Sequence, residues 1–496
     1  MDTTTENSAD YPQKSSAPVL SAADEGTRRK WWALAVVAIA QLMLVLDLAV
    51  VFVALPSIQR SLGISTADRQ WVVSAYAIPF GGLLLLGGRL VDGFGRKRTF
   101  VWAMIAFGAA SALGGAAPNG GLLFAARAIQ GSMAAVVAPA ILSLVSVTFT
   151  ERTERARAFA IYGMVAASGA ALGLILGGLL THYASWRWCF LINVPLAAAA
   201  ASAAAVVLRS DTGSRRPSYD VAGSVTATVG LVCLAEGFTS AGSAGWASKS
   251  ALAAFAVAIV TLGCFAVIES RSRSPLLPPR VVAEYHRALL YLAGFLADAA
   301  QLSMFLFLTY YFQVLNGYNA LRTGFAFLPF ALAVILTAFM SGRPFVRAGP
   351  LALMLTGAAL STLALLALGT LGAHEPYTTR IMLPEIIMGM GVALSLVPMN
   401  NVVLAGIGPE DAGVASAVLN ATGQMGNSMG SALLNSVFVT SVAGYLAVRV
   451  HHGDLIGANV YGDDIAFRCE SGMYAVAFVL IALAAWHLRR NAGQRS

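Results

Sequence analysis

Long apolar runs, separated by short polar segments, make up almost the whole chain. A transmembrane helix needs about 20 predominantly apolar residues. Fourteen runs long enough to form one occur near residues 31–55, 69–91, 99–117, 121–149, 157–182, 187–208, 220–240, 250–270, 286–313, 322–341, 349–371, 379–404, 412–446 and 471–488. The pattern predicts an all-α polytopic membrane protein with 14 transmembrane helices.

Composition supports this class and excludes others. Of the 496 residues, 57% are hydrophobic and 11% are charged, whereas soluble domains carry about 25% charged residues. The net charge of +8 does not indicate a nucleic-acid partner, because the basic residues lie in short loops rather than on one face. The four cysteines lack metal-ligand spacing, and no G-x-x-x-x-G-K-[ST] nucleotide site occurs. We therefore expect no metal, no cofactor and no enzymatic activity.

The distribution of Lys and Arg predicts the orientation. With the N-terminus inside, the inner segments hold 23 of the 32 Lys and Arg residues and the outer segments hold 8. Because cytoplasmic loops carry an excess of these residues, both termini are expected in the cytoplasm. The Ala-, Gly- and Arg-rich composition points to the cytoplasmic (inner) membrane of a bacterium. Residues 1–30 are expected to form a disordered tail and 491–496 a second tail. The segment near 447–470 is expected to be an outer loop carrying Asp454, Asp463, Asp464 and Glu470.

A glycine-rich basic stretch, GGRLVDGFGRKR, occupies residues 87–98. Its simplest interpretation is a basic turn between two membrane helices, where glycines allow the helix ends to approach closely. A weaker copy, SGRPFVRAG, lies 254 residues further on, at 341–349. There Gly342, Arg343 and Gly349 match Gly88, Arg89 and Gly95, and Val346 replaces Asp92.

Two further pairs of segments share nearly the same offset. The helices beginning near 31 and 286 are 255 residues apart, and GLILGG at 173–178 pairs with GNSMGS at 426–431. These offsets predict two related six-helix halves, 31–208 and 286–490, with two inserted helices in the linker segment 209–285. Parallel repeats of this kind occur in secondary transporters, whose binding site lies at the repeat interface.

Several segments together resemble the major facilitator superfamily, and within it the fourteen-helix drug:proton antiporter family. Residues 88–97 are similar to its motif A, Arg127–Gly131 to motif B, GAALGLILGG at 169–178 to the antiporter motif C, and LDLAVVFVALP at 46–56 to the first-helix motif. Leu174 stands where motif C has Pro, and Ala49 and Phe52 replace Thr and Asn of the first-helix motif. The resemblance implies two six-helix major-facilitator halves that transport by alternating access.

Four charged residues are candidates for positions inside the membrane, Asp47, Arg127, Asp298 and Glu385, whereas Glu236 and Asp92 lie nearer helix ends. Each such charge costs about 2.5–3.5 kcal/mol on insertion scales, which makes these residues candidates for function. Asp47, Arg127 and Asp298 are predicted to couple transport to protons if Asp47 and Arg127 approach in one state and separate in another. The alternatives are a permanent Asp47–Arg127 ion pair and an Asp298 held by its neighbours, such as Gln301. Glu385 could instead form a solvated pair with Arg380.

Glycines in the 157–182 helix form a second candidate. Gly169, Gly173 and Gly177 repeat every four residues, and Gly178 follows them. Small residues at this spacing allow helix backbones to pack in contact. Two interpretations stay open: ordinary tight packing, or a seal against the other half that opens and closes during transport.

Aromatic and amide side chains of the central helices are candidates for a substrate cavity. Met and aromatic surfaces adapt to varied ligands, and amides add polar contacts. The residues predicted to line it are Gln41, Trp71, Tyr76, Tyr310, Gln313, Glu385 and Asn400.

The predicted function is proton-coupled export of amphipathic or cationic drugs or antibiotics across the cytoplasmic membrane. We expect a monomer in the lipid bilayer with a small-molecule drug substrate and protons as partners. Gly88, Asp92, Gly95 and Arg96 are predicted to form a cytoplasmic latch. One alternative is a proton-coupled importer or exporter of a small metabolite with the same fold. Another is a membrane scaffold or sensor without transport, which the buried charges disfavour.

Overall fold

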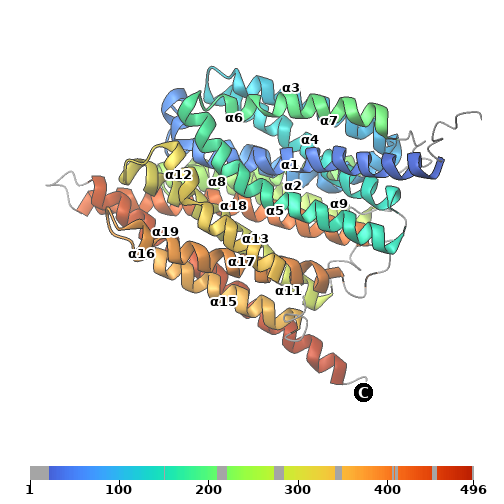
Figure 1. The fold of residues 1–496 in the computed structure, drawn as a ribbon. Helices are drawn as coiled ribbons and strands as arrows, with labels where there is room; N and C mark the ends of the chain where they lie inside the picture. Colours follow the sequence, from blue (N-terminus) through green and yellow to red (C-terminus); the bar gives the residue numbers. More distant parts are fainter. Residues whose placement is uncertain are drawn as a thin grey trace, which may run out of the picture.

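The computed structural model describes residues 22–149, 151–208, 220–272, 284–340, 349–404, 407, 412–448 and 455–493. These residues are almost entirely helical and contain no strand (Figure 1). The first part of the chain forms α1 (Ala22–Leu62), α2 (Trp71–Phe94), α3 (Arg96–Gly115), α4 (Gly120–Thr148), α5 (Arg152–Tyr183), α6 (Trp188–Leu191) and α7 (Asn193–Val207). Next come α8 (Val221–Ala244) and α9 (Lys249–Arg271). The last part forms α11 (Tyr285–Tyr310), η1 (Tyr311–Leu315), α12 (Ala320–Ala326), α13 (Leu328–Met340), α15 (Pro350–Leu368), α16 (Tyr377–Arg380), α17 (Met382–Leu404), α18 (Ala412–Val448) and α19 (Leu455–Gly493).

The all-α polytopic class predicted from the apolar runs is confirmed. Every predicted run falls on a helix or on consecutive helices. Among the described residues, 12 helices are long and apolar enough to cross a membrane. The remaining two, α3 and α5, pack among them; α3 begins with three basic residues, and the apolar stretch described in α5 is Leu172–Tyr183. The full count of 14 spans therefore stays a prediction.

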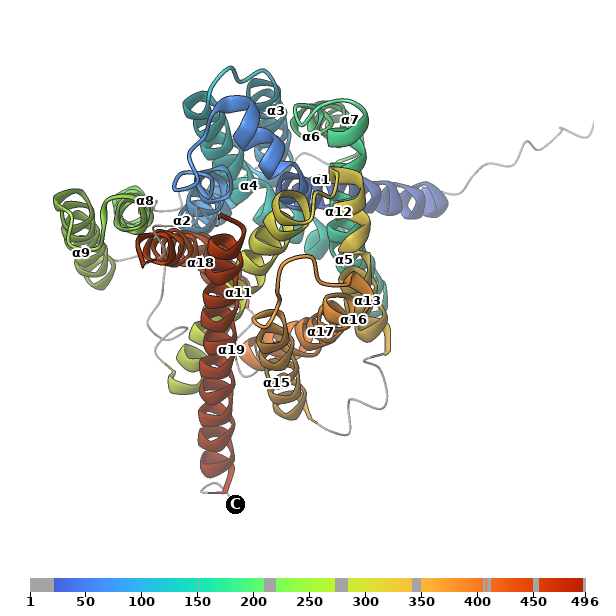
Figure 2. The same ribbon diagram turned by 90° about the vertical axis from the view of Figure 1, so that its left-hand side faces the viewer.

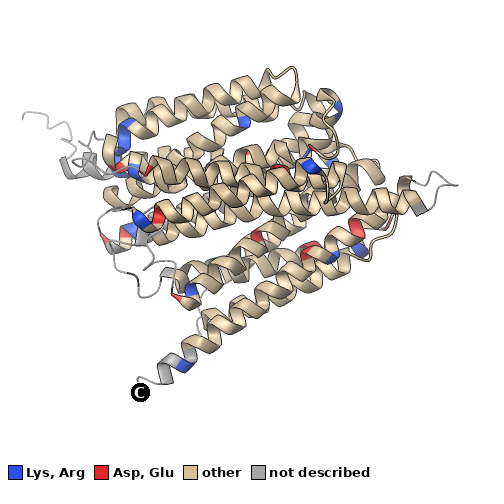
Figure 3. Ribbon diagram, turned by 180° about the vertical axis from the view of Figure 1, so that it is seen from behind, with Lys and Arg blue, Asp and Glu red and all other residues tan. Residues whose placement is uncertain are grey.

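The helices form two groups with α8 and α9 at one side. Following the predicted division of the chain, α1 to α7 are called here the N-terminal half and α11 to α19 the C-terminal half. Helix α8 packs against both halves, on α2 and α18, and α9 lies outside α8 (Figure 2). The described ends of the chain lie at the same end of the bundle, called here the termini end (Figure 1). The opposite end is called the distal end. Most charged residues lie towards these two ends (Figure 3).

The two halves share local backbone geometry where the sequence repeats. Gly95 joins α2 to α3 with a φ of 89°, and Gly349 precedes α15 with a φ of 80°. Only glycine adopts this region readily, because it has no Cβ. The other matched residues of the second copy, Gly342, Arg343 and Val346, lie outside the described residues.

Close glycine packing also recurs in both halves. A Cβ at Gly177 of α5 would lie 2.7 Å from the Val50 carbonyl oxygen of α1. A Cβ at Gly430 of α18 would lie 2.6 Å from the Ala299 Cα of α11. In each half, therefore, glycines allow one helix to pack backbone to backbone against the first helix of that half.

Helix extends further than the apolar runs indicated. α1 begins at Ala22 and α19 ends at Gly493, inside both segments predicted to be tails. The prediction of a loop over 447–470 is wrong from Leu455 onward, where α19 begins. Asp463 and Glu470 are buried in this helix rather than exposed in a loop. The prediction failed because the acids on the buried face of α19 interrupt the apolar pattern from which transmembrane runs were recognised.

We predict that Gly177→Ala destabilises the fold by about 1–3 kcal/mol, the range typical of overpacking. The added methyl group would meet the backbone of α1, which cannot rotate away. Gly163→Ala on the same helix is the matched control, because no atom lies within 4 Å of its Cβ position. Thermal unfolding of both variants in detergent checks this; equal melting temperatures would contradict the packing role.

Candidate functional site

A fully buried ion pair joins α1 to α4. The Nη1 atom of Arg127 lies 2.5 Å from Oδ2 of Asp47, and both side chains are 0% exposed. Burying two charges costs several kcal/mol per ion unless further hydrogen bonds satisfy them. The surroundings of each partner therefore decide whether the pair is stable.

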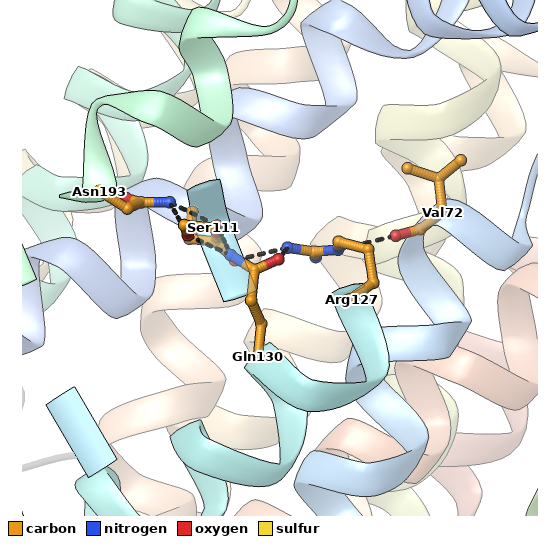
Figure 4. Close-up of polar contacts among 6 residues, drawn as sticks. Val72, Ser111, Arg127, Gln130 and Asn193 are labelled. Carbon is orange, nitrogen blue, oxygen red and sulfur yellow. Dashed lines mark hydrogen bonds and ion pairs between the residues drawn. The ribbon is translucent and has the colours of Figure 1, made fainter. Parts of the chain in front are cut away.

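Asp47 is satisfied by side chains from two other helices. Its Oδ1 accepts from Gln130 Nε2 of α4 at 3.0 Å and from Asn193 Nδ2 of α7 at 2.7 Å. The same two amides also donate to Ser111 Oγ of α3, at 2.6 Å and 3.3 Å (Figure 4). Gln130 lies three residues after Arg127, so both project from one face of α4. The local sequence Arg-x-x-Gln thus supplies two of the three partners of Asp47, and Asn193 of α7 supplies the third.

Arg127 is held against α2. Its Nε donates to the Val72 carbonyl oxygen at 3.0 Å (Figure 4). Its guanidinium lies 4.4 Å from the Tyr76 ring centroid. Its Nη2 is buried without a hydrogen-bond partner. All these contacts lie within the N-terminal half, so rocking of one half against the other leaves the pair intact. This geometry favours the structural ion pair over a pair that separates as the halves move.

Asp298 lies elsewhere, in a cavity of the C-terminal half. The cavity has a volume of about 230 Å³ and is lined from α11, α17, α18 and α19. Its polar lining residues are Asp298, Gln301, Ser395, Asn400, Asn420, Gln424, Asn427 and Tyr474. Asp298 is the one carboxylate among the lining residues. The cavity combines a single acid with amides that can both donate and accept hydrogen bonds.

Gly423 of α18 lets the carboxylate approach that helix. A Cβ at this position would clash with Oδ2 of Asp298. Tyr474 of α19 interacts electrostatically with Asp298 from the other side. Drug-sized ligand pockets have volumes of roughly 300–1,000 Å³, so this cavity is smaller than that range.

The predicted cavity residues do not gather in one place. Of them only Asn400 lines the cavity. Gln41 is buried in α1, Trp71 packs beside α8 and α18, and Tyr76 lies under Arg127. Tyr310 and Gln313 bond to Gln59 and to the Val53 carbonyl oxygen of α1, so they join the two halves near the distal end. A shared substrate cavity lined by these residues stays a prediction, because aromatic and amide composition does not show which face of a helix meets a cavity.

Glu385 is buried rather than paired in solvent with Arg380. Its Oε2 accepts from the Tyr377 hydroxyl at 3.4 Å, and its Oε1 has no hydrogen-bond partner. Arg380 instead donates to the Thr370 carbonyl oxygen at 3.1 Å. The interpretation as a solvated Glu385–Arg380 pair is therefore wrong.

The residues of the predicted latch lie at the termini end of α2 and α3. Asp92 is exposed, and Arg96 Nε donates to Ser143 Oγ of α4 at 2.6 Å, within its own half. Gly88 faces Pro139 of α4, where a Cβ would lie at 3.8 Å, and Gly95 forms the turn. A latch between halves stays a prediction.

The glycines of α5 divide between two neighbours. Gly169, Gly173 and Gly177 face α1, in the same half, whereas a Cβ at Gly178 would lie 2.6 Å from the Ala320 carbonyl oxygen of α12. A Cβ at Gly324 of α12 would lie 2.5 Å from the Leu174 carbonyl oxygen in return. Close contact between the halves at this point thus depends on Gly178 and Gly324, and the other three serve packing. With Leu174 in place of Pro, α5 runs unbroken from Arg152 to Tyr183.

The buried charged residues that the sequence analysis missed include Arg69 and Arg287, and the two acids Asp463 and Glu470. The two acids lie seven residues apart, which is two helical turns and therefore one face. That spacing was the available signal, but it lay within a segment interpreted as a loop.

Comparison with known proteins agrees with this architecture. Residues 37–431 match the family described as Major Facilitator Superfamily. The puromycin resistance protein pur8 of Streptomyces alboniger is 41% identical over 482 residues, covering 96% of this chain and 95% of that protein. The cephamycin export protein CmcT of Amycolatopsis lactamdurans is 36% identical, and the match covers 86% of this chain and 90% of that protein. The lincomycin resistance protein of Streptomyces lincolnensis is 32% identical, and the match covers 84% of this chain and 86% of that protein.

Solved structures show the same fold at low identity. The POT family transporter PepTSo superimposes with a TM-score of 0.67 and 15% identity, covering 93% of this chain and 98% of that one. An inward-facing bacterial homologue of the human lysosomal transporter Spinster superimposes with a TM-score of 0.65 and 16% identity. The match covers 92% of this chain and 97% of that one. With a family match across most of its length and relatives that span nearly the whole chain, this multi-pass membrane protein belongs to the Major Facilitator Superfamily.

Proposed function

We propose that this protein exports amphipathic, cationic antibiotics from the bacterial cytoplasm in exchange for protons, by alternating access. Relatives that span nearly the whole chain are named for resistance to puromycin and lincomycin and for export of cephamycin. The substrate class follows from the cavity rather than from these names.

The observation that carries the proposal is the single carboxylate in the cavity. Asp298 has amides beside it and no basic side chain among the lining residues. A carboxylate in such a place binds either a proton or the ammonium group of a substrate, because each neutralises its charge. Competition for one group makes the two ligands exclude one another, and this negative coupling is what exchange requires.

Alternating access is supported by where the halves meet. At the distal end, Gln313 Nε2 donates to the Val53 carbonyl oxygen at 2.8 Å, and Gly178 packs on α12. The Lys and Arg bias predicts that the termini end faces the cytoplasm. In this arrangement the contacts close the outer side, so substrate would enter the cavity from the cytoplasm.

The Asp47–Arg127 pair has a supporting role in this mechanism. It fixes α1, α2, α3, α4 and α7 as one body, so that the N-terminal half moves as a unit. Proton exchange is assigned to Asp298 in the other half.

We predict that Asp298→Asn lowers proton-driven accumulation of a cationic dye in everted membrane vesicles by about tenfold or more. Equilibration of the dye down its own gradient should persist, because the fold and cavity remain. Asp464→Asn is the control, since this acid lies outside the cavity and pairs with Arg468 at 2.6 Å. Undiminished proton-driven uptake in Asp298→Asn would contradict the assignment of the carrier.

For the buried pair, Asp47→Asn or Arg127→Gln alone should destabilise the protein by about 3–5 kcal/mol, because one charge stays buried and unpaired. The double variant removes both charges and should recover most of the stability and the proton-driven transport. Thermal unfolding and vesicle uptake measure the two effects. A stable double variant without proton coupling would instead make Asp47 the proton carrier.

At the termini end, Asp92→Asn should lower the turnover rate several-fold with little change in dye affinity. The exposed carboxylate is proposed to act only when that end closes, and the cavity lies elsewhere. Initial rates over a range of dye concentrations separate the two quantities. A weaker dye affinity with unchanged turnover would remove Asp92 from the latch.

A further inference from the structure

Three buried ionisable side chains lie near the distal end, away from both sites described above. Arg69 precedes α2 in the N-terminal half, and Asp463 and Glu470 lie on α19 in the C-terminal half. Their exposed fractions are 2%, 5% and 0%. Groups this costly to bury are uncommon in a membrane protein without a function.

Arg69 reaches from one half into the other. Its Nε donates to Asn435 Oδ1 of α18 at 2.8 Å. Its guanidinium lies 4.0 Å from the Tyr310 ring centroid and 4.9 Å from that of Phe438. Its Nη2 is buried without a hydrogen-bond partner, and Asp463 is near enough to interact with it electrostatically. All its partners belong to the C-terminal half, so parting of the halves at the distal end removes Arg69 from them.

The two acids lack the donors that an ionised carboxylate needs. Both oxygens of Glu470 and Oδ1 of Asp463 are buried without a hydrogen-bond partner. Asp47 differs in this respect, because it receives three hydrogen bonds. A buried carboxyl without such donors is stable when it holds a proton and becomes neutral. Because the two acids lie seven residues apart, on one face of α19, a negative charge on one disfavours a second negative charge on the other.

Few other charged groups face this pair. From η1, Tyr311 interacts with Asp463, and on α19 itself Tyr474 interacts with Glu470 and with Asp298 of α11. In the described sequence of α15 no residue is ionisable, and on α18 only Tyr445 is. Arg468, on the same helix as the acids, is 61% exposed and pairs with Asp464. Among the described residues, Arg69 is therefore the cation that acts on Asp463.

We propose that Asp463 and Glu470 form a proton-binding site in the C-terminal half, and that Arg69 of the N-terminal half controls its occupancy. This inference rests on the proposed proton-coupled transport. With the halves in contact, Arg69 favours an ionised Asp463. When they part at the distal end, Arg69 leaves, and the Asp463 carboxylate takes one proton from that side to become a neutral acid.

The position of the site connects it to the cavity. Glu470 lies about 10 Å further along α19 than Asp463, and Tyr474 one turn beyond it. Tyr474 lines the cavity that holds Asp298. When Arg69 returns and displaces the proton from Asp463, Glu470 is the next acid towards the cavity. The site would therefore load protons from the distal side and deliver them where substrate is exchanged.

Infrared difference spectroscopy of the full-length protein in lipid nanodiscs tests the site, because a protonated carboxyl has a distinct C=O stretch. A pH change should give carboxyl signals in the wild type. Glu470→Gln, a nearly isosteric and neutral replacement, should remove one of them, whereas Asp464→Asn should leave them unchanged. A spectrum of Glu470→Gln identical to the wild type would overturn the proposal.

Arg69→Gln tests the control by the other half. Loss of the cation beside Asp463 should move the midpoint of the carboxyl titration to higher pH by about one unit or more. The conservative Arg69→Lys should restore most of the wild-type midpoint. An Arg69→Gln variant that is folded by thermal unfolding but titrates like the wild type would overturn this control.

Proton-driven dye export by the same variants in proteoliposomes separates this inference from the proposed function. If the wild type exports without dependence on protons, the proposed function fails, and with it the premise of the inference. If the wild type is proton-driven and Glu470→Gln keeps both its coupling and its carboxyl signals, only the inference fails. Loss of coupling together with one carboxyl signal supports both.

Discussion

Burial of charge is the constraint on which this structure depends. In the bilayer interior, water cannot solvate ions or backbone groups, so partners must come from the protein. The N-terminal half meets this demand around Asp47, which receives hydrogen bonds from Arg127, Gln130 and Asn193. Those donors come from α4 and α7, and Arg127 also bonds to the backbone of α2. One carboxylate therefore holds several helices in a fixed arrangement.

The C-terminal half contrasts with this arrangement. Asp298 lies in a cavity, and Asp463 and Glu470 have buried oxygens without donors. A carboxylate that accepts hydrogen bonds from several fixed donors has its charge compensated by the protein, whereas one without donors is free to bind a proton or a cation. This difference suggests a division of labour in which one half is a rigid body and the other holds the groups that change charge.

Glycine packing is consistent with two halves that are each tightly packed inside and contact each other closely. Gly177 and Gly430 let α5 and α18 pack on the first helix of their own halves, so each half has a tight interior. Between the halves, Gly178 and Gly324 allow a similarly close approach at α5 and α12. Contacts of this kind have no side chains to rearrange, so they could part and re-form in the proposed alternating-access cycle. Arg69, bonded to Asn435 across the same division, adds a charge that moves with them.

The sequence by itself determined the all-α membrane class, because apolar length and the scarcity of charge follow from the bilayer alone. The sequence also determined the turns at Gly95 and Gly349, because a backbone with positive φ favours glycine and the repeated motif has glycine at both positions. It paired Asp47 with Arg127 only as a possibility, and the partners Gln130, Asn193 and Ser111 come from segments far apart in the chain. Tertiary structure alone decided that Asn400 faces the cavity and Tyr310 does not, and that Asp463 and Glu470 lie inside the bundle. The reason is that a helical pattern shows which residues share a face, but the partner of that face is set by packing across the whole chain.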